Sequence, residues 1–241
     1  MNTYIYQHPG PLMPARFVSR PHRFSTVCRL EEDGSVVESH LADPGRLAEV
    51  LVPGARVWLR GPFGPPRKLA WSTVMGEVEG VGVNLVASVA NELFPVMLGA
   101  GLFPEIATGE TLVGLDAEVS MGRSRVDFVA HTEEGSWVIE VKAMDLKVGG
   151  RAMWPDAPSR RGLKHVRLLQ VRAARGEAAA MVFVAGRGDV EGFGPAAHVD
   201  PGFAEALADA VAAGVVVLAV RVSWDAVGAH SPVRLEVDVQ G

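Results

Sequence analysis

The sequence predicts a two-domain protein of mixed α+β and α/β class. An OB-like β-barrel is expected at residues 1–85, and a mixed sheet flanked by helices at residues 86–241. Short strand-like runs separated by turns fill the first part, whereas strand and helix periods alternate in the second. The 241 residues are enough for one large domain or two small ones.

The first part contains the pattern of a small barrel. Residues 23–30 and 35–41 flank the sequence EEDG, whose Asp-Gly pair tolerates the positive φ of a tight hairpin turn. A short helix is expected at residues 45–51, with Asp43 as its cap and Pro44 in its first turn. Three more strands are expected at residues 55–60, 68–78 and 80–86. Five strands and one helix favour the oligonucleotide-binding (OB) fold.

From about residue 86 the pattern predicts helices between strands. Three helices are expected at residues 86–101, 160–176 and 201–214, with Ser159 capping the second and Gly176 ending it. Strands are expected at residues 115–120, 124–132, 136–144, 178–186 and 215–224, and a loop at residues 147–159. Three consecutive strands, followed by strands that alternate with helices, indicate a mixed sheet with helices on its faces.

The apolar run WVIEVKAM at residues 137–144 has the length and the valine content of a buried strand. It nevertheless carries Glu140 and Lys142, which point to one face because side chains alternate along a strand. A buried charge is costly unless it is paired or coordinates an ion. Glu140 and Lys142 therefore either neutralise each other or serve a function there.

The preceding strand adds a second carboxylate to this face. With the turn at residues 134–135, Asp127 is expected opposite Lys142, and Asp127 and Glu140 become diagonal neighbours that can share an ion. One ammonium neutralises only one carboxylate, so the group retains a negative charge. The alternative is a strand end near solvent with an ion pair of little energetic weight.

The excess of carboxylates suits a hard divalent cation, Mg²⁺ or Mn²⁺, bound by Asp127, Glu140 and the Val141 carbonyl. A metal held in this way activates water and stabilises the charge that develops in phosphodiester hydrolysis. Lys142 would orient the water or stabilise the leaving group. Glu118, one strand earlier, is either a third ligand or an exposed strand-end acid.

The formal net charge of −5 argues weakly against nucleic acid as a partner, but basic residues are concentrated locally. Residues 142–175 carry nine Lys and Arg against two Asp. The helix expected there offers phosphate contacts or is simply a solvated basic face. The candidates on this helix are Arg160, Arg161, Lys164 and His165.

A second basic cluster lies near the N-terminus, interleaved with Phe17 and Phe24. Basic and aromatic side chains together suit single-strand binding by charge and stacking. The alternative places the phenylalanines in the barrel core and uses Arg46 for a cap or an ion pair. The candidate contacts are Arg16, Arg20, Arg23 and Arg46.

Several classes of protein are excluded or disfavoured. Cys28 is the single cysteine, which excludes an internal disulfide and a cysteine-based zinc site. The sequence has no nucleotide-phosphate loop, nucleophile elbow or metal-binding histidine pair, so a metabolite enzyme has no support. Neither a signal-like N-terminus nor a membrane-length apolar run is present, and a cytoplasmic location is expected.

Four separated stretches resemble the sugar fermentation stimulation protein A family: PARFVSRPHRF, HLADPGRLAEVLVPG, GRSRVDF and WPDAPSRRGLKHVRLL. The resemblance spans nearly the whole chain. It implies a DNA-binding protein with an OB-like domain and a PD-(D/E)xK nuclease-like domain. It also places the nuclease motif on Asp127, Glu140 and Lys142, and Trp154 stands where the family more often has phenylalanine.

The leading hypothesis is therefore a Mg²⁺- or Mn²⁺-dependent nuclease acting on DNA, or on RNA. The alternative is a non-catalytic DNA-binding regulator of sugar-utilisation genes, because regulation requires binding alone. The sequence leaves the oligomeric state open, a dimer included.

Overall fold

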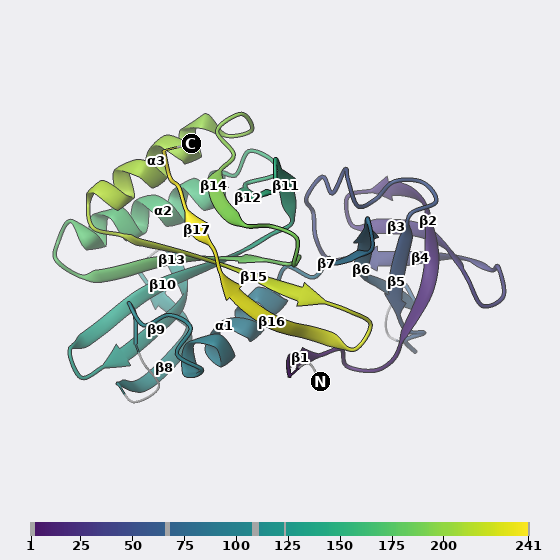
Figure 1. Ribbon diagram of the computed structural model, residues 1–241, viewed down its shortest axis with the longest axis horizontal. Helices are drawn as coiled ribbons and strands as arrows, with labels where there is room; N and C mark the ends of the chain where they lie inside the picture. Colours follow the sequence, from purple (N-terminus) through teal and green to yellow (C-terminus); the bar gives the residue numbers. More distant parts are fainter. Residues whose placement is uncertain (1–2, 66–67, 108–110, 123, 241) are drawn as a thin grey trace. The chain divides into compact units, whose positions relative to one another are not determined.

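The computed structural model describes residues 3–65, 68–107, 111–122 and 124–240 (Figure 1). The chain divides into two compact units. The first comprises Met1–Ala87, Gly186–Asp189 and Val222–Ser231, and the second comprises Ser88–Ala185, Val190–Arg221 and Pro232–Gly241. None of the described helices is long and apolar enough to cross a membrane.

Within the first unit, six strands form one sheet in the order β4-β3-β2-β5-β6-β7. They are β2 (Leu12–His22), β3 (Ser25–Leu30), β4 (Val36–Leu41), β5 (Arg56–Arg60), β6 (Trp71–Val78) and β7 (Val81–Asn84). A further pairing between β4 and β6 closes five of these strands into a ring, because the sheet curls until its ends meet. The expected OB-like barrel is confirmed.

Two expectations for this unit are wrong. The barrel contains β2, which the sequence pattern did not predict because Pro14 and Pro21 interrupt it. The helix expected at residues 45–51 is replaced by turns. Asp43 instead accepts a hydrogen bond from the Gly45 N–H at 2.7 Å, so its side chain shapes a turn.

The segment at residues 186–189 is bound to the barrel by a buried arginine. The Arg187 side chain is fully buried and forms ion pairs with Glu49 at 3.2 Å and Asp189 at 2.6 Å. Its backbone also forms an isolated bridge with Val83. These contacts explain why a short segment from late in the chain belongs to the first unit.

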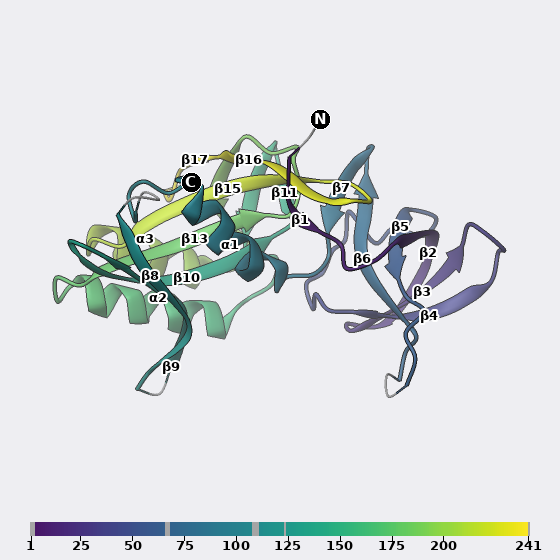
Figure 2. The same cartoon turned by 90° about the horizontal axis from the view of Figure 1, so that it is seen from below.

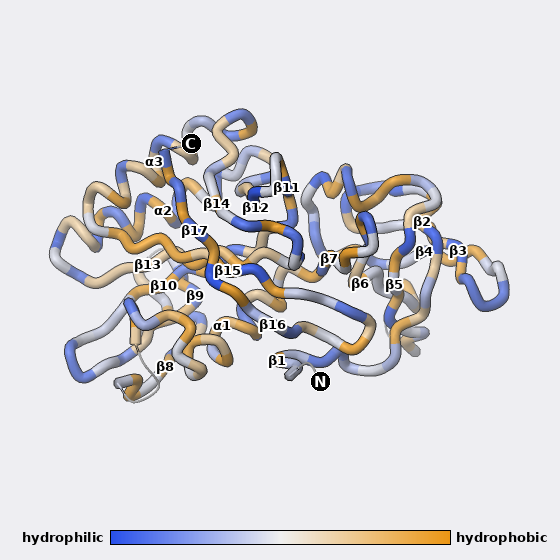
Figure 3. The backbone as a smooth tube through the Cα atoms, in the orientation of Figure 1, coloured by the Kyte–Doolittle hydropathy of each residue, from blue (hydrophilic) through white to orange (hydrophobic). Residues whose placement is uncertain are grey.

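The second sheet has seven strands in the order β1-β16-β15-β13-β10-β9-β8. Their bounds are β1 (Tyr4–Gln7), β8 (Leu112–Met121), β9 (Ser124–Thr132), β10 (Gly135–Met144), β13 (Ala178–Ala185), β15 (Val216–Trp224) and β16 (Gly228–Arg234). Strands β10, β13 and β15 are parallel, whereas β8, β9 and β10 are antiparallel. The predicted mixed sheet is confirmed, and Figure 3 shows the apolar character of β13, typical of a strand covered on both faces.

Three helices pack on this sheet: α1 (Val89–Gly99), α2 (Arg160–Ala173) and α3 (Pro201–Ala212). Phe94 of α1 contacts Phe128 at a ring distance of 5.0 Å, whereas α2 and α3 pack on the face that carries Val138. Figures 1 and 2 show α2 and α3 side by side. As predicted, Ser159 caps α2, and its hydroxyl accepts the Gly162 N–H at 3.0 Å.

The loop expected at residues 147–159 is partly a β-hairpin. Strands β11 (Leu146–Val148) and β12 (Arg151–Trp154) meet at Gly149 and Gly150, both of which have positive φ. With β14 (Gly192–Pro195) and β17 (Glu236–Val237) they form a small third sheet. Strands this short give little sequence signal, since two to four residues show no periodicity.

A buried hydroxyl chain links three strands of the barrel and should stabilise its closure. Thr26 and Thr73 lie 2.7 Å apart, and Thr73 donates to Ser39 at 2.9 Å. We expect Thr73→Val to remove the buried donor to Ser39 and to leave Thr26 with only the weak donor Cys28, at a cost of about 1–3 kcal/mol. The thermal unfolding midpoint should fall by roughly 2–10 °C. Thr3→Val, at an exposed position, is the matched control, and equal midpoints for the two variants would contradict this role.

Candidate active site on strands β9 and β10

The register of the β9–β10 hairpin differs from the predicted one by two residues. The turn is formed by residues 133–134, so that Gly135 pairs with Thr132 and Ile139 with Phe128. Gly135 adopts φ 143°, which glycine tolerates and other residues rarely do, and this permits the earlier turn. Because the shift is an even number, the charges stay on the expected face, and Asp127 faces Glu140 directly.

Glu140 is the buried centre of the candidate site, with no exposed surface. Its Oε2 atom accepts hydrogen bonds from Lys142 Nζ at 2.8 Å and from His165 Nδ1 at 2.6 Å. Its Oε1 atom is also buried and has no hydrogen-bond partner in the described part of the chain. One oxygen is thus held by two donors, and the other retains its full capacity to accept.

Asp127 lies beside Glu140 and is held by different groups. Its Oδ2 atom accepts the Val141 N–H at 2.8 Å, and its Oδ1 atom accepts from Asn91 of α1 at 3.3 Å. Lys142 Nζ lies 3.7 Å from Oδ2. The single ammonium therefore contacts both carboxylates, as the sequence predicted, but it is closer to Glu140.

The two carboxyl groups have pKa values shifted in opposite directions. Burial raises the pKa of Asp127; the positive charge of Lys142 opposes this, and the negative charge of Glu140 adds to it. Burial would also raise the pKa of Glu140, but the hydrogen bond from His165 and the charge of Lys142 lower it to about 2. The ionised form of Glu140 is thus favoured by its donors, whereas burial disfavours the ionised form of Asp127.

His165 was expected among the nucleic-acid contacts but lies in the carboxylate cluster. It is buried on the inner face of α2 with Gly162, Val166 and Leu169. These positions follow the spacing i, i+3, i+4, i+7 of one helix face, and this spacing was the signal that could have identified it. Asn91 was also missed, and nothing in its local pattern distinguishes it from a surface residue.

The structure does not bring Glu118 to the pair. The register of β8 places it across from Asp127, because Ala117 pairs with Phe128 and Val119 with Val126. Its backbone has φ 57°, however, and its half-exposed carboxylate forms an ion pair with Arg125 at 2.7 Å. Within the described residues, no group of three His, Cys, Asp or Glu side chains is arranged to hold a metal.

The predicted basic contacts on α2 are accessible. Arg160, Arg161 and Lys164 are exposed on the first two turns of the helix. Arg161 precedes His165 by four residues and so lies one turn away on nearly the same side of the helix. The basic face, defined here as Arg160, Arg161 and Lys164, therefore begins about one helical turn from His165.

The basic residues of the first unit have more varied roles. Arg20 donates to the backbone carbonyls of Arg23, Asp43, Gly45 and Arg46, so its guanidinium orders two loops. Arg16 forms an ion pair with Glu31 at 2.8 Å. Arg23 lies over the ring of Phe24 at 4.7 Å. Phe17 belongs to the barrel core, whereas Phe24 is 39% exposed.

Comparisons with known proteins agree with this architecture. One family model, "Sugar fermentation stimulation protein RE domain", matches residues 88–228, and a second, "SfsA N-terminal OB domain", matches residues 18–85. The chain belongs to the sugar fermentation stimulation protein family. The family division places the carboxylate pair in the C-terminal domain and the barrel in the N-terminal one.

Relatives in this family match over most of their length. The sugar fermentation stimulation protein homolog of Moorella thermoacetica is 38% identical over 91% of this chain and 93% of its own. The homolog of Chloroflexus aurantiacus is 36% identical over 91% of this chain and 83% of its own. The solved structure of Pyrococcus furiosus SfsA in complex with Ca²⁺ superposes with a TM-score of 0.86 at 27% identity, over 98% of this chain and 99% of that one.

The opposite pKa shifts predict opposite effects of removing each charge when no divalent cation is present. Glu140→Gln should destabilise the fold by about 3 kcal/mol at neutral pH, because it leaves the largely buried Lys142 ammonium with only the more distant carboxylate of Asp127. Asp127→Asn should leave stability unchanged or raise it, because it removes a charge that burial disfavours. Chemical denaturation with a chelator present measures both, and Glu134→Gln on the same hairpin is the exposed control.

The effect of Glu140→Gln should depend on pH. A folded-state pKa of about 2, against an ordinary value of 4.5, means that ionised Glu140 contributes its stability above pH 4.5. That contribution is lost as the pH falls from 4.5 toward 2. The difference in unfolding free energy between wild type and Glu140→Gln should therefore shrink over this range, and a difference independent of pH would contradict the assignment.

Proposed function

We propose that the chain is a divalent-metal-dependent phosphodiesterase that hydrolyses DNA at the Asp127–Glu140 pair. The observation that carries the proposal is the buried Oε1 atom of Glu140, which has no partner in the described part of the chain. A buried acceptor without a partner is costly, and a cation bound beside it would satisfy it. Mg²⁺ or Mn²⁺ suits two carboxylates completed by water.

The residues present fit such an ion in their charge as well as in their donor atoms. Lys142 supplies one positive charge to two carboxylates, and burial, with the negative charge of Glu140, still raises the pKa of Asp127. A divalent cation would favour the ionised form of Asp127 and oppose the effect of burial. The Ca²⁺ in the structure of the Pyrococcus furiosus relative supports a hard cation in this family. When bound, the metal would acidify water and stabilise negative charge on a phosphoryl group.

The protein's own groups would divide the remaining work. Lys142 is 14% exposed and contacts both carboxylates, so its ammonium can hold an attacking water or neutralise a leaving oxygen. His165 donates to Glu140 Oε2, which leaves Oε1 as the atom that would bind a cation. Asn91 and the Val141 N–H hold Asp127 in place. His165 and Asn91 are thus positioning residues.

The expected substrate is nucleic acid because the basic face begins one helical turn from His165. Exposed Arg and Lys side chains attract phosphates whatever the base sequence. The OB barrel, a fold that commonly binds oligonucleotides, provides a second surface for the same polymer. DNA is the proposed substrate, and cleavage assays on RNA test the other polymer directly.

The proposal predicts cleavage that depends on both metal and Lys142. Wild type should cleave labelled DNA with Mg²⁺ or Mn²⁺ and not with a chelator. Lys142→Ala should lower the rate by about a hundredfold or more, a typical loss for one electrostatic group at a reacting centre. Lys147→Ala, outside the cluster, is the control. Cleavage by Lys142→Ala at the wild-type rate would overturn the assigned role.

Metal binding can be measured separately from cleavage. Mn²⁺ should raise the unfolding midpoint of wild type, because a ligand that binds only the folded state stabilises it. The rise should be absent in Asp127→Asn and retained in Glu118→Gln, since Glu118 lies away from the pair. An equal rise in Asp127→Asn would place the cation elsewhere.

The basic face should determine much of the salt dependence of DNA binding. Every phosphate that a variant no longer neutralises should lower the slope of log affinity against log salt by about 0.9 for duplex DNA. Replacing Arg160, Arg161 and Lys164 together by alanine should reduce the slope accordingly, and Arg125→Ala is the single-charge control. An unchanged slope would show that the basic face is solvated and does not contact DNA.

A non-catalytic DNA-binding regulator is the second candidate, and one observation favours it. Lys142 and His165 already engage one oxygen of Glu140, and no third metal ligand joins the pair among the described residues. In that case Lys142→Ala would leave salt-sensitive DNA binding intact, and no substrate would be cleaved with any metal. Cleavage that disappears in Lys142→Ala would exclude this candidate.

A further inference from the structure

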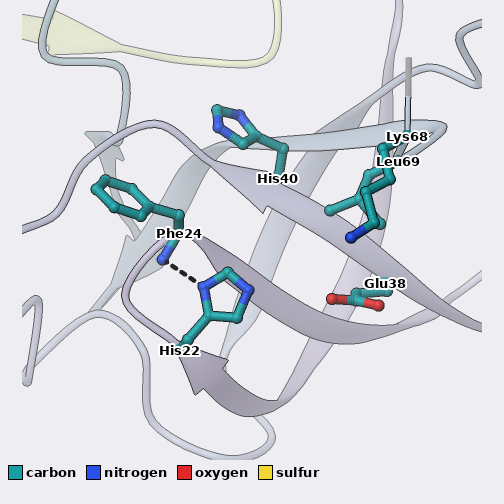
Figure 4. Close-up of a pocket in the computed structure, with 6 residues that line it drawn as sticks. All are labelled: His22, Phe24, Glu38, His40, Lys68 and Leu69. Carbon is teal, nitrogen blue, oxygen red and sulfur yellow. Dashed lines mark hydrogen bonds between the residues drawn. The ribbon is translucent and has the colours of Figure 1, made fainter. Parts of the chain in front are cut away.

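A groove on the outside of the barrel gathers aromatic, basic and acidic side chains that neither the carboxylate pair nor the basic face uses. It has a volume of about 470 Å³ (Figure 4). We call it the barrel groove, and its lining consists of His22, Phe24, Glu38, His40, Lys68 and Leu69. In chain order β3 and β4 are the second and third strands of the closed ring, and the groove lies over them. The turns before β3 and before β6 complete it, and OB folds commonly bind ligands at this combination of elements.

From this groove we propose that the barrel binds an unpaired guanine of a single-stranded nucleic acid, with Phe24 stacking on the base and Glu38 reading its edge. The inference rests on the proposed function only in taking nucleic acid as the ligand. It requires neither the metal nor cleavage.

Phe24 provides the stacking surface. It is 39% exposed on the turn between β2 and β3, where its N–H donates to His22 Nδ1 at 3.2 Å. The guanidinium of Arg23 lies 4.7 Å from its ring centre. An exposed phenyl ring beside a cation suits a base and its phosphate together, since the ring stacks on the base while the cation attracts the backbone.

Glu38 determines which base fits. Alternation along β4 buries Ser39 and Leu41 and leaves Glu38 and His40 exposed on the outer side. Among the described residues, no ion pair engages Glu38. A carboxylate repels phosphate, so it is unsuited to backbone binding but can accept hydrogen bonds from a base. Its presence beside Phe24 and Lys68 in the groove therefore points to base recognition.

Guanine matches a carboxylate better than the other bases do. Its Watson–Crick edge presents two adjacent N–H donors, at N1 and N2, which can meet the two oxygens of one carboxylate. In cytosine and adenine the amino group lies next to a ring nitrogen that can only accept a hydrogen bond. In thymine the single N–H lies between two carbonyls. In a duplex this edge is occupied by the paired cytosine. The groove should therefore select an unpaired guanine, with Lys68 and the two histidines near the flanking phosphates.

The test is fluorescence anisotropy of labelled oligothymidylates carrying one central guanosine, one inosine or no substitution, with a chelator present throughout. Inosine lacks only the N2 amino group. Wild type should bind the guanosine strand about tenfold or more tighter than the inosine strand, as for one hydrogen bond to a charged group. A duplex that pairs the guanosine should show no such preference.

Two variants connect the preference to the groove. Glu38→Gln should abolish the discrimination between guanosine and inosine, whereas Glu32→Gln, an exposed acid on the next turn, should keep it. Phe24→Leu should weaken binding of every single strand by about five- to a hundredfold, and Phe24→Trp should retain it. Circular dichroism confirms that each variant is folded.

The outcomes separate this proposal from the nuclease. Equal binding of the three strands by wild type, or discrimination that persists in Glu38→Gln, would overturn guanine recognition even if DNA is cleaved. Conversely, Asp127→Asn should keep the full guanosine preference while losing any cleavage. A preference that disappears in Asp127→Asn would show that the groove does not recognise the base by itself.

Discussion

The fully buried charge of Glu140 is the constraint on which the C-terminal sheet depends. An isolated carboxylate at this depth would be protonated, because burial penalises the ionised form. Lys142 on the same strand and His165 on α2 prevent this by donating to one oxygen. The sheet and the helix therefore meet around a charged centre as well as through apolar contacts.

This constraint also explains why the site has two unlike carboxylates. The donors are used on Glu140, so Asp127 receives only weak help from Lys142 and depends on the Val141 N–H and Asn91. The positive charge of Lys142 lies closer to Glu140 than to Asp127, so an added cation can still act on Asp127, whereas two fully neutralised acids would not respond to one. The asymmetry is a property of several strands and helices together, not of one motif.

Much of this arrangement could be predicted from sequence, and the errors have physical causes. The face shared by Asp127, Glu140 and Lys142 was predicted because alternation along a strand is independent of the turn. The register was wrong by two because Gly135 can begin a strand with a backbone conformation that other residues avoid. Glu118 lies away from the pair because its own backbone turns, which no periodicity reveals.

The helices were predictable because Ser159 and the apolar spacing of α2 are local signals. The barrel closure was inferred only from the number of strands, and β2 was missed because two prolines lie in it. Contacts between distant segments, such as Asn91 with Asp127 or Arg187 with Glu49, leave no trace in a single sequence. They arise from the tertiary fold.

The attachment of residues 186–189 to the barrel has a consequence for how the protein is made. Glu49 leaves the ribosome long before Arg187, its buried partner in an ion pair. Gly82 likewise leaves the ribosome long before Trp224, whose backbone carbonyl lies against Gly82. The N-terminal barrel therefore cannot acquire all its contacts while it is the only part synthesised. Its completion waits for nearly the whole chain, so the first domain to emerge is finished only shortly before the second.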